Sequence, residues 1–91
     1  MKSTLVHVDC QFSPGMFDTE YAILLSTTAG NVSLFADKDL VVVNGSKDHG
    51  YLKATALTEI AAPVVDVLLP NETELGTRVV GVPRERVKIA A

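Results

Sequence analysis

Two residues near the start of the chain have side chains that can do acid–base chemistry or bind a metal ion. His7 and Asp9 are two positions apart, so an extended strand would place both side chains on one face. Histidine and carboxylate side chains are common metal ligands and common acid–base groups. A structural zinc site needs four ligands, however, and the chain has only two His and one Cys. We therefore interpret the pair as part of a solvated polar face. A small metal-binding protein or enzyme remains the third hypothesis.

Cys10 could act as a nucleophile with His7 or His49 as its base. It alternates in phase with Val6 and Val8, however, which places its side chain in the predicted core. Burial raises the pKa of a thiol and makes it unreactive, so we predict a structural role. The sequence contains no phosphate-binding glycine loop, nucleophile elbow or zinc-protease motif. We expect a non-catalytic protein without a cofactor.

The charges are unevenly distributed along the chain. Residues 1–77 hold four Lys against ten acidic residues, whereas residues 78–91 hold four basic residues against one Glu. If the segment 84–88 is extended, its basic side chains share one face and could bind phosphate or an acidic protein surface. The alternative is a charged strand that protects a sheet edge. A net charge of −3 and 5% aromatic residues argue against nucleic-acid binding. The candidate anion-binding residues are Arg78, Arg84, Arg86 and Lys88.

Two apolar runs, residues 40–43 and 64–69, depart from alternation between buried and exposed positions. A strand that is apolar on both faces is either covered on both sides or forms a contact with another molecule. The leading hypothesis is therefore a protein-interaction or assembly module that binds a protein partner or a second copy of itself. The second hypothesis is binding of an anion or nucleic acid through the basic C-terminal strand. The candidate interaction surface consists of Val41, Val42, Val43, Val64, Val65 and Leu68.

The elements that would position these residues are strands. Thirteen Val, three Ile and eight Thr make up 24 of the 91 residues, and these residue types favour a pleated sheet over a helix. Apolar residues alternate with polar or outward-facing ones over much of the chain, as in strands with one buried face. The alternation is clearest over residues 5–10, 20–25 and 32–37.

Turn residues separate these strands. Pro14-Gly15 suits the centre of a type II turn, in which Gly takes a positive φ. Ala29-Gly30-Asn31 and Asp37-Lys38-Asp39 are predicted to be short hairpin loops. A longer loop begins at Asn44-Gly45 and ends at Gly50, and an acidic loop is expected over residues 70–76.

Residues 51–62 fit a helix or a strand, and we favour a strand because the polar side chains would scatter around a helix axis. Three further short strands are expected over 64–69, 77–82 and 86–90. No internal repeat or linker is evident, so we expect a single domain over residues 1–91. The predicted fold is all-β, a small antiparallel barrel or sandwich of about seven or eight short strands.

The run Gly81-Val82-Pro83-Arg84-Glu85-Arg86-Val87 resembles the closing segment of SH3-like barrels, where a Pro and a short turn lead into the last strand. The resemblance implies a small barrel. It does not imply binding of Pro-rich peptides, because the chain has no Trp and Arg86 stands where such domains usually have Tyr.

The remaining expectations concern location. No apolar stretch approaches the roughly 18 residues that a membrane span requires. The first ten residues lack the uninterrupted apolar region of a secretory signal, and a single Cys suits a reducing compartment. We expect a cytoplasmic protein without membrane contact.

Overall fold

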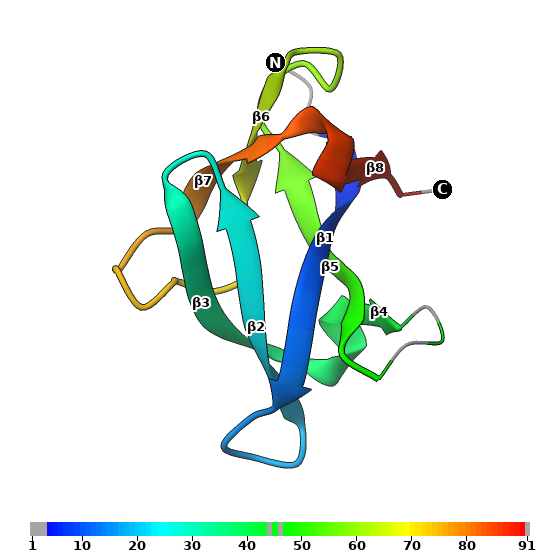
Figure 1. Ribbon diagram of the computed structural model, residues 1–91, viewed down its shortest axis with the longest axis vertical. Coiled ribbons are helices and arrows are strands. Elements are labelled where there is room, and N and C mark those ends of the chain that lie inside the picture. The colour runs from blue at the N-terminus through cyan, green and yellow to red at the C-terminus, as the bar shows by residue number, and fades with distance from the viewer. Residues whose placement is uncertain (1–3, 44, 46, 91) are drawn as a thin grey trace.

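The computed structural model describes residues 4–43, 45 and 47–90, which form one curled antiparallel sheet of eight strands, a half-barrel (Figure 1). Two 3-10 turns, η1 (Lys38–Leu40) and η2 (Arg84–Arg86), are the only helical segments in this part of the chain. None of its helices could cross a membrane. The all-β prediction is confirmed. The strands are β1 (Thr4–Pro14), β2 (Glu20–Thr27), β3 (Gly30–Asp37), β4 (Val41–Val43), β5 (His49–Ala56), β6 (Val64–Leu68), β7 (Val79–Pro83) and β8 (Val87–Ile89).

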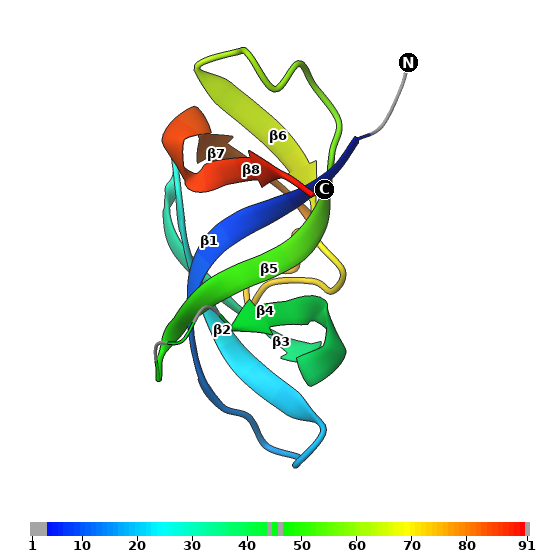
Figure 2. The same cartoon turned by 90° about the vertical axis from the view of Figure 1, so that its right-hand side faces the viewer.

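The sheet is built around the pair of long strands β1 and β5. Its main path runs in the order β3-β2-β1-β5-β6-β7, while β4 pairs with β5 and β8 pairs with β1. β1 pairs with the whole length of β5, from Thr4 opposite Ala56 to Gln11 opposite His49. Figure 2 shows these two strands crossing the molecule side by side, with β8 and β4 on their outer edges.

The two halves of the chain have the same arrangement of elements. Each half is a meander of three strands followed by a 3-10 turn and a short strand, and η2 and β8 begin 46 residues after η1 and β4 (84 against 38, and 87 against 41). Asp37 and Pro83, which precede the turns, have nearly equal φ values of −57° and −56°. Each short strand pairs with the first strand of the other half. The two halves therefore repeat each other in the order and pairing of their strands, although no repeat is evident in residue identity.

The core lies on the concave side of the curled sheet. Alternate residues of β1 point into it, as the period of two predicts, and so do alternate residues of β2, β3 and β5. The buried apolar residues are Val6, Val8, Cys10, Phe12, Ile23, Leu25, Val32, Leu34, Ala36, Val41, Leu52, Ala54, Ala56, Val65, Val67, Leu69, Val82 and Val87.

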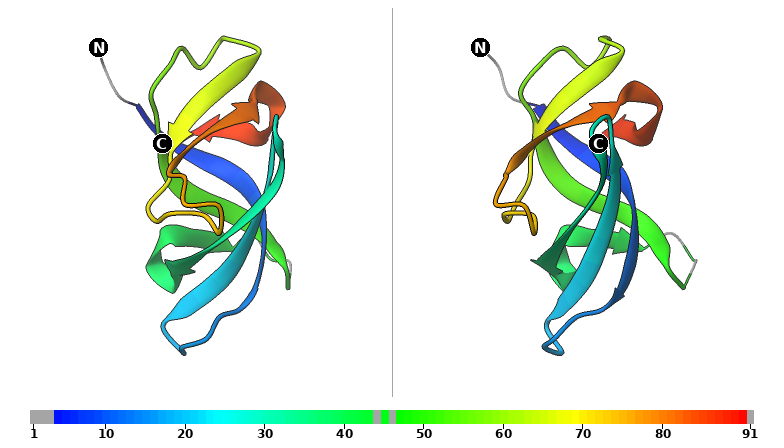
Figure 3. Two further views of the ribbon diagram at one scale, coloured as in Figure 1. Left: turned by 90° about the vertical axis from the view of Figure 1, so that its left-hand side faces the viewer. Right: turned by 60° about the vertical axis from the view of Figure 1, so that its left-hand side comes forward.

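A few hydrogen bonds hold the ends of the curled sheet together. The backbone N–H of Thr28, in the β2–β3 turn, donates to the carbonyl of Gly81 on β7 (2.9 Å). The loop after β6 lies along the free edge of β3, where the side chain of Asn71 donates to the carbonyl of Phe35 (2.6 Å) and the N–H of Glu74 donates to the carbonyl of Ser33 (2.9 Å). Figure 3 shows this loop and β7 beside β3. These hydrogen bonds satisfy backbone groups on the edge of β3 that could otherwise pair with a strand of another molecule.

Two of the predicted turns differ from expectation. Gly15 does not have a positive φ, so the type II turn is wrong. A Cβ at Gly15 would lie 2.7 Å from Cγ of Glu20, and this close approach explains the glycine. Asp37-Lys38-Asp39 is not a hairpin loop, because β3 leads into η1 and β4 pairs with β5 instead of β3.

The strand predicted over 51–62 is confirmed only as far as Ala56. Beyond it, the N–H of Leu57 donates to the carbonyl of Asp66 (2.8 Å), and a turn follows in which the N–H of Ala62 donates to the carbonyl of Glu59 (3.1 Å). The basic segment 84–88 is likewise not fully extended, because η2 occupies its first three residues. The turn after Pro83 leads directly into β8, the arrangement expected from residues 81–87.

Candidate functional site

The most distinctive feature of the sheet is a gap beside β5. One edge of β5 pairs with β1 along its whole length. On the other edge β4 reaches only as far as Leu52, and pairing with β6 begins at Thr55. Within the described chain, no strand lies opposite Lys53 and Ala54 on this edge. Because the N–H of Leu57 points toward β6 and strand residues alternate between edges, the backbone N–H and C=O of Lys53 also point toward the gap.

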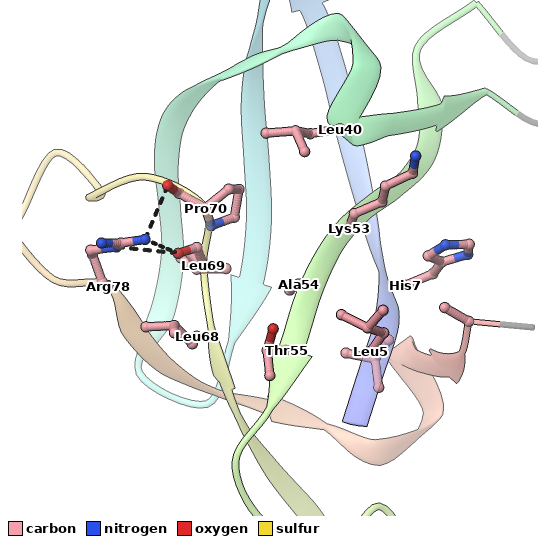
Figure 4. Close-up of a pocket in the computed structure, with 12 residues that line it drawn as sticks. Leu5, His7, Leu40, Lys53, Ala54, Thr55, Leu68, Leu69, Pro70 and Arg78 are labelled. Carbon is pink, nitrogen blue, oxygen red and sulfur yellow. Dashed lines mark hydrogen bonds between the residues drawn. The ribbon is translucent and has the colours of Figure 1, made fainter. Parts of the chain in front are cut away.

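The gap opens into a groove of about 470 Å³, which we call the β5 groove (Figure 4). Leu40 of η1 lies at one end, and Leu68, Leu69 and Pro70 form the wall across from β5. Its volume falls within the range of pockets that hold small ligands. The lining consists of Leu5, Val6, His7, Leu40, Lys53, Ala54, Thr55, Leu68, Leu69, Pro70, Arg78 and Ala90.

Arg78 fixes the wall of the groove. Its guanidinium donates to the carbonyl of Leu69 through Nε (3.3 Å) and Nη2 (3.1 Å), and to the carbonyl of Pro70 (3.2 Å). The N–H of Leu69 in turn donates to the carbonyl of Arg78 (2.7 Å). Arg78 therefore supplies positive charge at the groove. Its hydrogen bonds also hold the segment that leaves β6 against the segment that enters β7.

A row of three basic side chains crosses the sheet at the groove. Lys88 of β8 lies directly opposite His7 of β1, and His7 lies directly opposite Lys53 of β5. Directly opposed residues have their side chains on the same face, so we call these three residues the cationic row. His7 and Lys53 also line the groove. Lys88 and Lys53 flank His7 in this row, so negative charge bound there would meet two ammonium groups.

Tyr51 orients one end of the cationic row. The Nζ of Lys88 donates to the Oη of Tyr51 (2.8 Å) and lies 4.7 Å from the centre of its ring. The ring of His7 stacks against the same tyrosine, with 6.3 Å between centroids. The hydrogen bond to Tyr51 raises the pKa of Lys88, and the negative charge of Asp9 acts in the same direction. Lys88 is thus held in place in its charged form.

The charge of the groove is opposite to that of the whole chain. The chain carries a net charge of −3, yet the only charged residues that line the groove within the described structure are basic. An apolar floor bordered by cations fits a ligand that combines an apolar group with a negative one. The lining residues supply an apolar surface and positive charge for such a ligand.

The six residues of the predicted interaction surface are not on one surface. Val41 and Val65 are buried in the core, Val42 is half-buried, and Val43 and Val64 are exposed on different strands. Only Leu68 lines the β5 groove. The two apolar runs nevertheless meet there, through Leu40 from the first and Leu68 and Leu69 from the second.

The four predicted anion-binding residues also separate. Arg78 lies at the groove wall and Lys88 belongs to the cationic row, as described above. Arg86 in η2 forms an ion pair with Asp9 (3.5 Å), and Arg84 is exposed in the same turn. The turn at η2 breaks the continuous basic face that an extended strand would have had.

His7 and Asp9 share a face of β1, as the sequence predicts, but they serve different neighbours. His7 belongs to the cationic row, whereas Asp9 pairs with Arg86. Among the described residues, neither belongs to a group of three or more His, Cys, Asp or Glu side chains placed to hold a metal ion. The pair therefore has no further ligands around it.

A second gap on β1 occupies the equivalent place in the other half. β8 pairs with β1 as far as Val8, and pairing with β2 begins at Gln11, which leaves Asp9 and Cys10 without a strand on that edge in the described structure. The pocket there has a volume of about 300 Å³ and a mostly polar lining. The lining residues are Asp9, Cys10, Gln11, Leu24, Ser26, Asn31, His49 and Arg86.

Cys10 is buried below this second pocket, as predicted. Burial and the neighbouring Asp9 carboxylate raise the pKa of its thiol to about 12. The thiol is therefore protonated and a poor nucleophile near neutral pH, in keeping with a structural role.

Comparison of the chain with models of protein families, with curated proteins and with solved structures finds no match. The site must therefore be interpreted from its own residues. Leu40 belongs to the apolar run 40–43 that was singled out from the sequence, whereas Lys53 and Tyr51 were not identified in this way. The positions of Lys53 and Tyr51 depend on the register between β1, β5 and β8.

Proposed function

We propose that this chain is a non-catalytic protein-interaction module whose β5 groove binds a segment of a partner that carries an apolar side chain next to an acidic one. The apolar side chain lies over Ala54 and Leu68, and the acidic one contacts Lys53 and His7. The observation that supports this proposal is the exclusively basic charge around an apolar groove, in a chain that is acidic overall.

The dimensions of the gap favour a turn or an exposed side chain over an extended strand. Lys53 and Ala54 together span roughly 7 Å at about 3.3 Å per residue. An added strand of ordinary length would meet β4 at Leu52 and β6 at Thr55. The unpaired backbone groups of Lys53 are available for one or two hydrogen bonds to the partner, which would fix its orientation.

A selection of random peptides displayed on phage tests this function even though the partner is not identified. Peptides enriched on the wild-type chain should combine a large apolar residue with Asp or Glu. Lys53→Glu should weaken their binding at least tenfold, because it places a negative charge beside the acidic residue. Lys47→Glu, an exposed change of the same charge in the β4–β5 loop, is the matched control and should have little effect. Failure to enrich such peptides, or equal binding to both variants, would overturn the proposal.

A second candidate function is binding of a small anion or of nucleic acid, and the cationic row favours it. Phosphate groups bind well between several basic side chains, and Lys88 is already oriented by Tyr51. On duplex DNA the affinity should fall with salt with a log–log slope of about −0.9 for each phosphate contacted. Lys88→Ala and Lys53→Ala should each flatten that slope. An unchanged slope would exclude the cationic row as the binding site.

The likeness to SH3-like barrels remains part of the proposal for the closing segment. Pro83, the turn at η2 and the pairing of β8 with β1 support it. SH3-like barrels serve in many proteins as interaction modules, and the β5 groove gives this chain a recognition surface without the tryptophan pair of the peptide-binding members. Pro-rich peptides should therefore not bind.

A further inference from the structure

The hairpin between β1 and β2 ends in two large apolar side chains that face solvent. Met16 is 75% exposed and Phe17 is 68% exposed. Isolated apolar residues on a surface need no explanation, but two consecutive ones at the end of a projecting hairpin point to a contact with another molecule. Figures 1 and 2 show this hairpin projecting at one end of the molecule, where β1 leads into β2.

The hairpin tip is held in one conformation. The N–H of Gly15 donates to the carbonyl of Glu20 (3.3 Å), and the N–H of Glu20 donates to the carbonyl of Phe17 (3.2 Å). The carboxylate of Glu20 also accepts a hydrogen bond from the N–H of Met16 (3.2 Å). The tip is thus ordered before any partner binds, which lowers the entropy cost of inserting its side chains elsewhere.

The charge of the tip is complementary to that of the β5 groove. Asp18 directly follows the two apolar residues, and Glu20 lies opposite Asp37 of β3. Lys38, whose backbone N–H donates to the carbonyl of Thr19 (2.9 Å), adds one basic residue beside these three acidic ones. The groove, in contrast, has an apolar floor and basic residues at Lys53, His7 and Arg78. The tip therefore has the combination of apolar and acidic side chains that the proposed function requires of a partner.

We infer that the partner is a second copy of this chain, and that its β1–β2 tip inserts Phe17 into the β5 groove with Asp18 near Lys53. This inference rests on the proposed function, which it deepens by naming the occupant. The tip cannot reach the groove of its own chain, because Pro14 at the end of β1 lies seven residues, roughly 23 Å, beyond His7 along the same strand. Each copy consequently offers one tip and one groove, and binding joins copies head to tail.

A contact between two different surfaces has a specific consequence for assembly. Such a heterologous contact closes into a ring or continues as an open chain, whereas a two-fold dimer uses the same surface twice. The mass in solution should rise with concentration beyond that of a dimer. It should fall with salt, because part of the attraction is between exposed charges.

The test combines two variants that each lack one surface. The tip variant, Met16→Ser with Phe17→Ser, retains the groove, and the groove variant, Lys53→Glu with Thr55→Glu, retains the tip. Light scattering after size exclusion should find each variant monomeric by itself. An equal mixture should form a dimer and nothing larger, because one intact tip meets one intact groove. Leu75→Ser, which changes a similarly exposed apolar residue outside the tip and the groove, should assemble like the wild type.

The outcomes separate the inference from the proposed function. A monomeric wild type, a mixture that stays monomeric, or self-association that survives in the tip variant would overturn the inference. If the phage-derived peptides still bind the groove in those cases, the proposed function stands and the partner is a different protein. If neither the tip nor any apolar–acidic peptide binds, both are wrong.

Discussion

Val8 and Leu52 lie directly opposite each other on β1 and β5, and each also pairs with the first residue of a short strand, Val8 with Val87 of β8 and Leu52 with Val41 of β4. They are therefore equivalent positions in the two halves of the chain that also pair with each other, which places the approximate two-fold relation between the halves at this pair. Gaps open on either side of it. The gap on β5 opens into the apolar β5 groove with its basic neighbours, and the gap on β1 opens into the polar pocket around Asp9.

Adjacent residues of β6 provide a matched test of which apolar residues are core. Val65 is fully buried and Val64 is 42% exposed. Val65→Lys should unfold the chain, because an unpaired buried charge costs several kcal/mol and a small domain has only about 5 kcal/mol or little more in total. Val64→Lys should change the free energy of unfolding by less than about 0.5 kcal/mol. Circular dichroism with urea titration measures both, and equal effects would contradict the assigned faces of β6.

The pKa of Cys10 predicts how the chain responds to alkaline pH. Its pKa is raised from 9.0 to about 12 in the folded chain, so the folded state favours the neutral thiol. The corresponding stability is fully present below about pH 9 and is lost as the pH rises toward 12. Cys10→Ala should reduce this alkaline loss. In the folded wild type, alkylation by iodoacetamide should be much slower than in urea, and equal rates would show that the thiol is accessible.

The hydrogen bonds of Glu74 predict how the stability of the chain changes at acidic pH. Ser33 donates to its carboxylate from the backbone N–H and from the hydroxyl (2.9 Å), and these bonds lower the pKa of Glu74 below its ordinary 4.5. The contribution to stability is therefore present above about pH 4.5 and is lost as the pH falls through the lowered value. Glu74→Gln should reduce the loss of unfolding free energy at acidic pH, as measured by urea titration. Glu72→Gln, in the same loop, is the control, and an equal flattening by both would contradict the role of Ser33.

The space around Gly50 shows how closely β4 approaches β5. A Cβ at this position would lie 2.5 Å from the carbonyl oxygen of Val42 and 3.3 Å from the ring of Phe12. Gly50→Ala should destabilise the chain by about 1–3 kcal/mol, because it overpacks this contact. It should also weaken peptide binding, since β4 positions Leu40 at the end of the groove. An unchanged urea midpoint would show that β4 is displaced easily.

The strands could be predicted from the sequence because period-two alternation and turn residues are local signals. The pattern around Val6, Val8 and Cys10 was sufficient to place β1 and its buried face. The 3-10 turn after Asp37 was not predicted, because the charged tripeptide Asp37-Lys38-Asp39 fits a hairpin loop equally well. Which strand β4 would join depended on long-range pairing, and the sequence carries no local signal for that.

The candidate site could be predicted only in fragments. Leu68 and Lys88 were identified for different reasons, one as part of an apolar run and the other as part of a basic segment. The structure connects them through β5, whose register with β1 and β8 sets the cationic row. Lys53 has no distinguishing neighbour in the sequence, so its place between His7 and the groove could not be foreseen.

The most direct test of the proposed groove is a titration of the ¹⁵N-labelled chain with a minimal probe, followed by NMR. The probe is N-acetyl-Phe-Asp-amide, and N-acetyl-Phe-Lys-amide is its charge-reversed control. The acidic probe should shift the amide signals of Leu40, Lys53, Ala54 and Leu68, and the basic probe should shift them far less. Shifts that are absent, equal for the two probes, or centred on Asp9 and His49 would contradict a β5 groove that recognises apolar and acidic groups together.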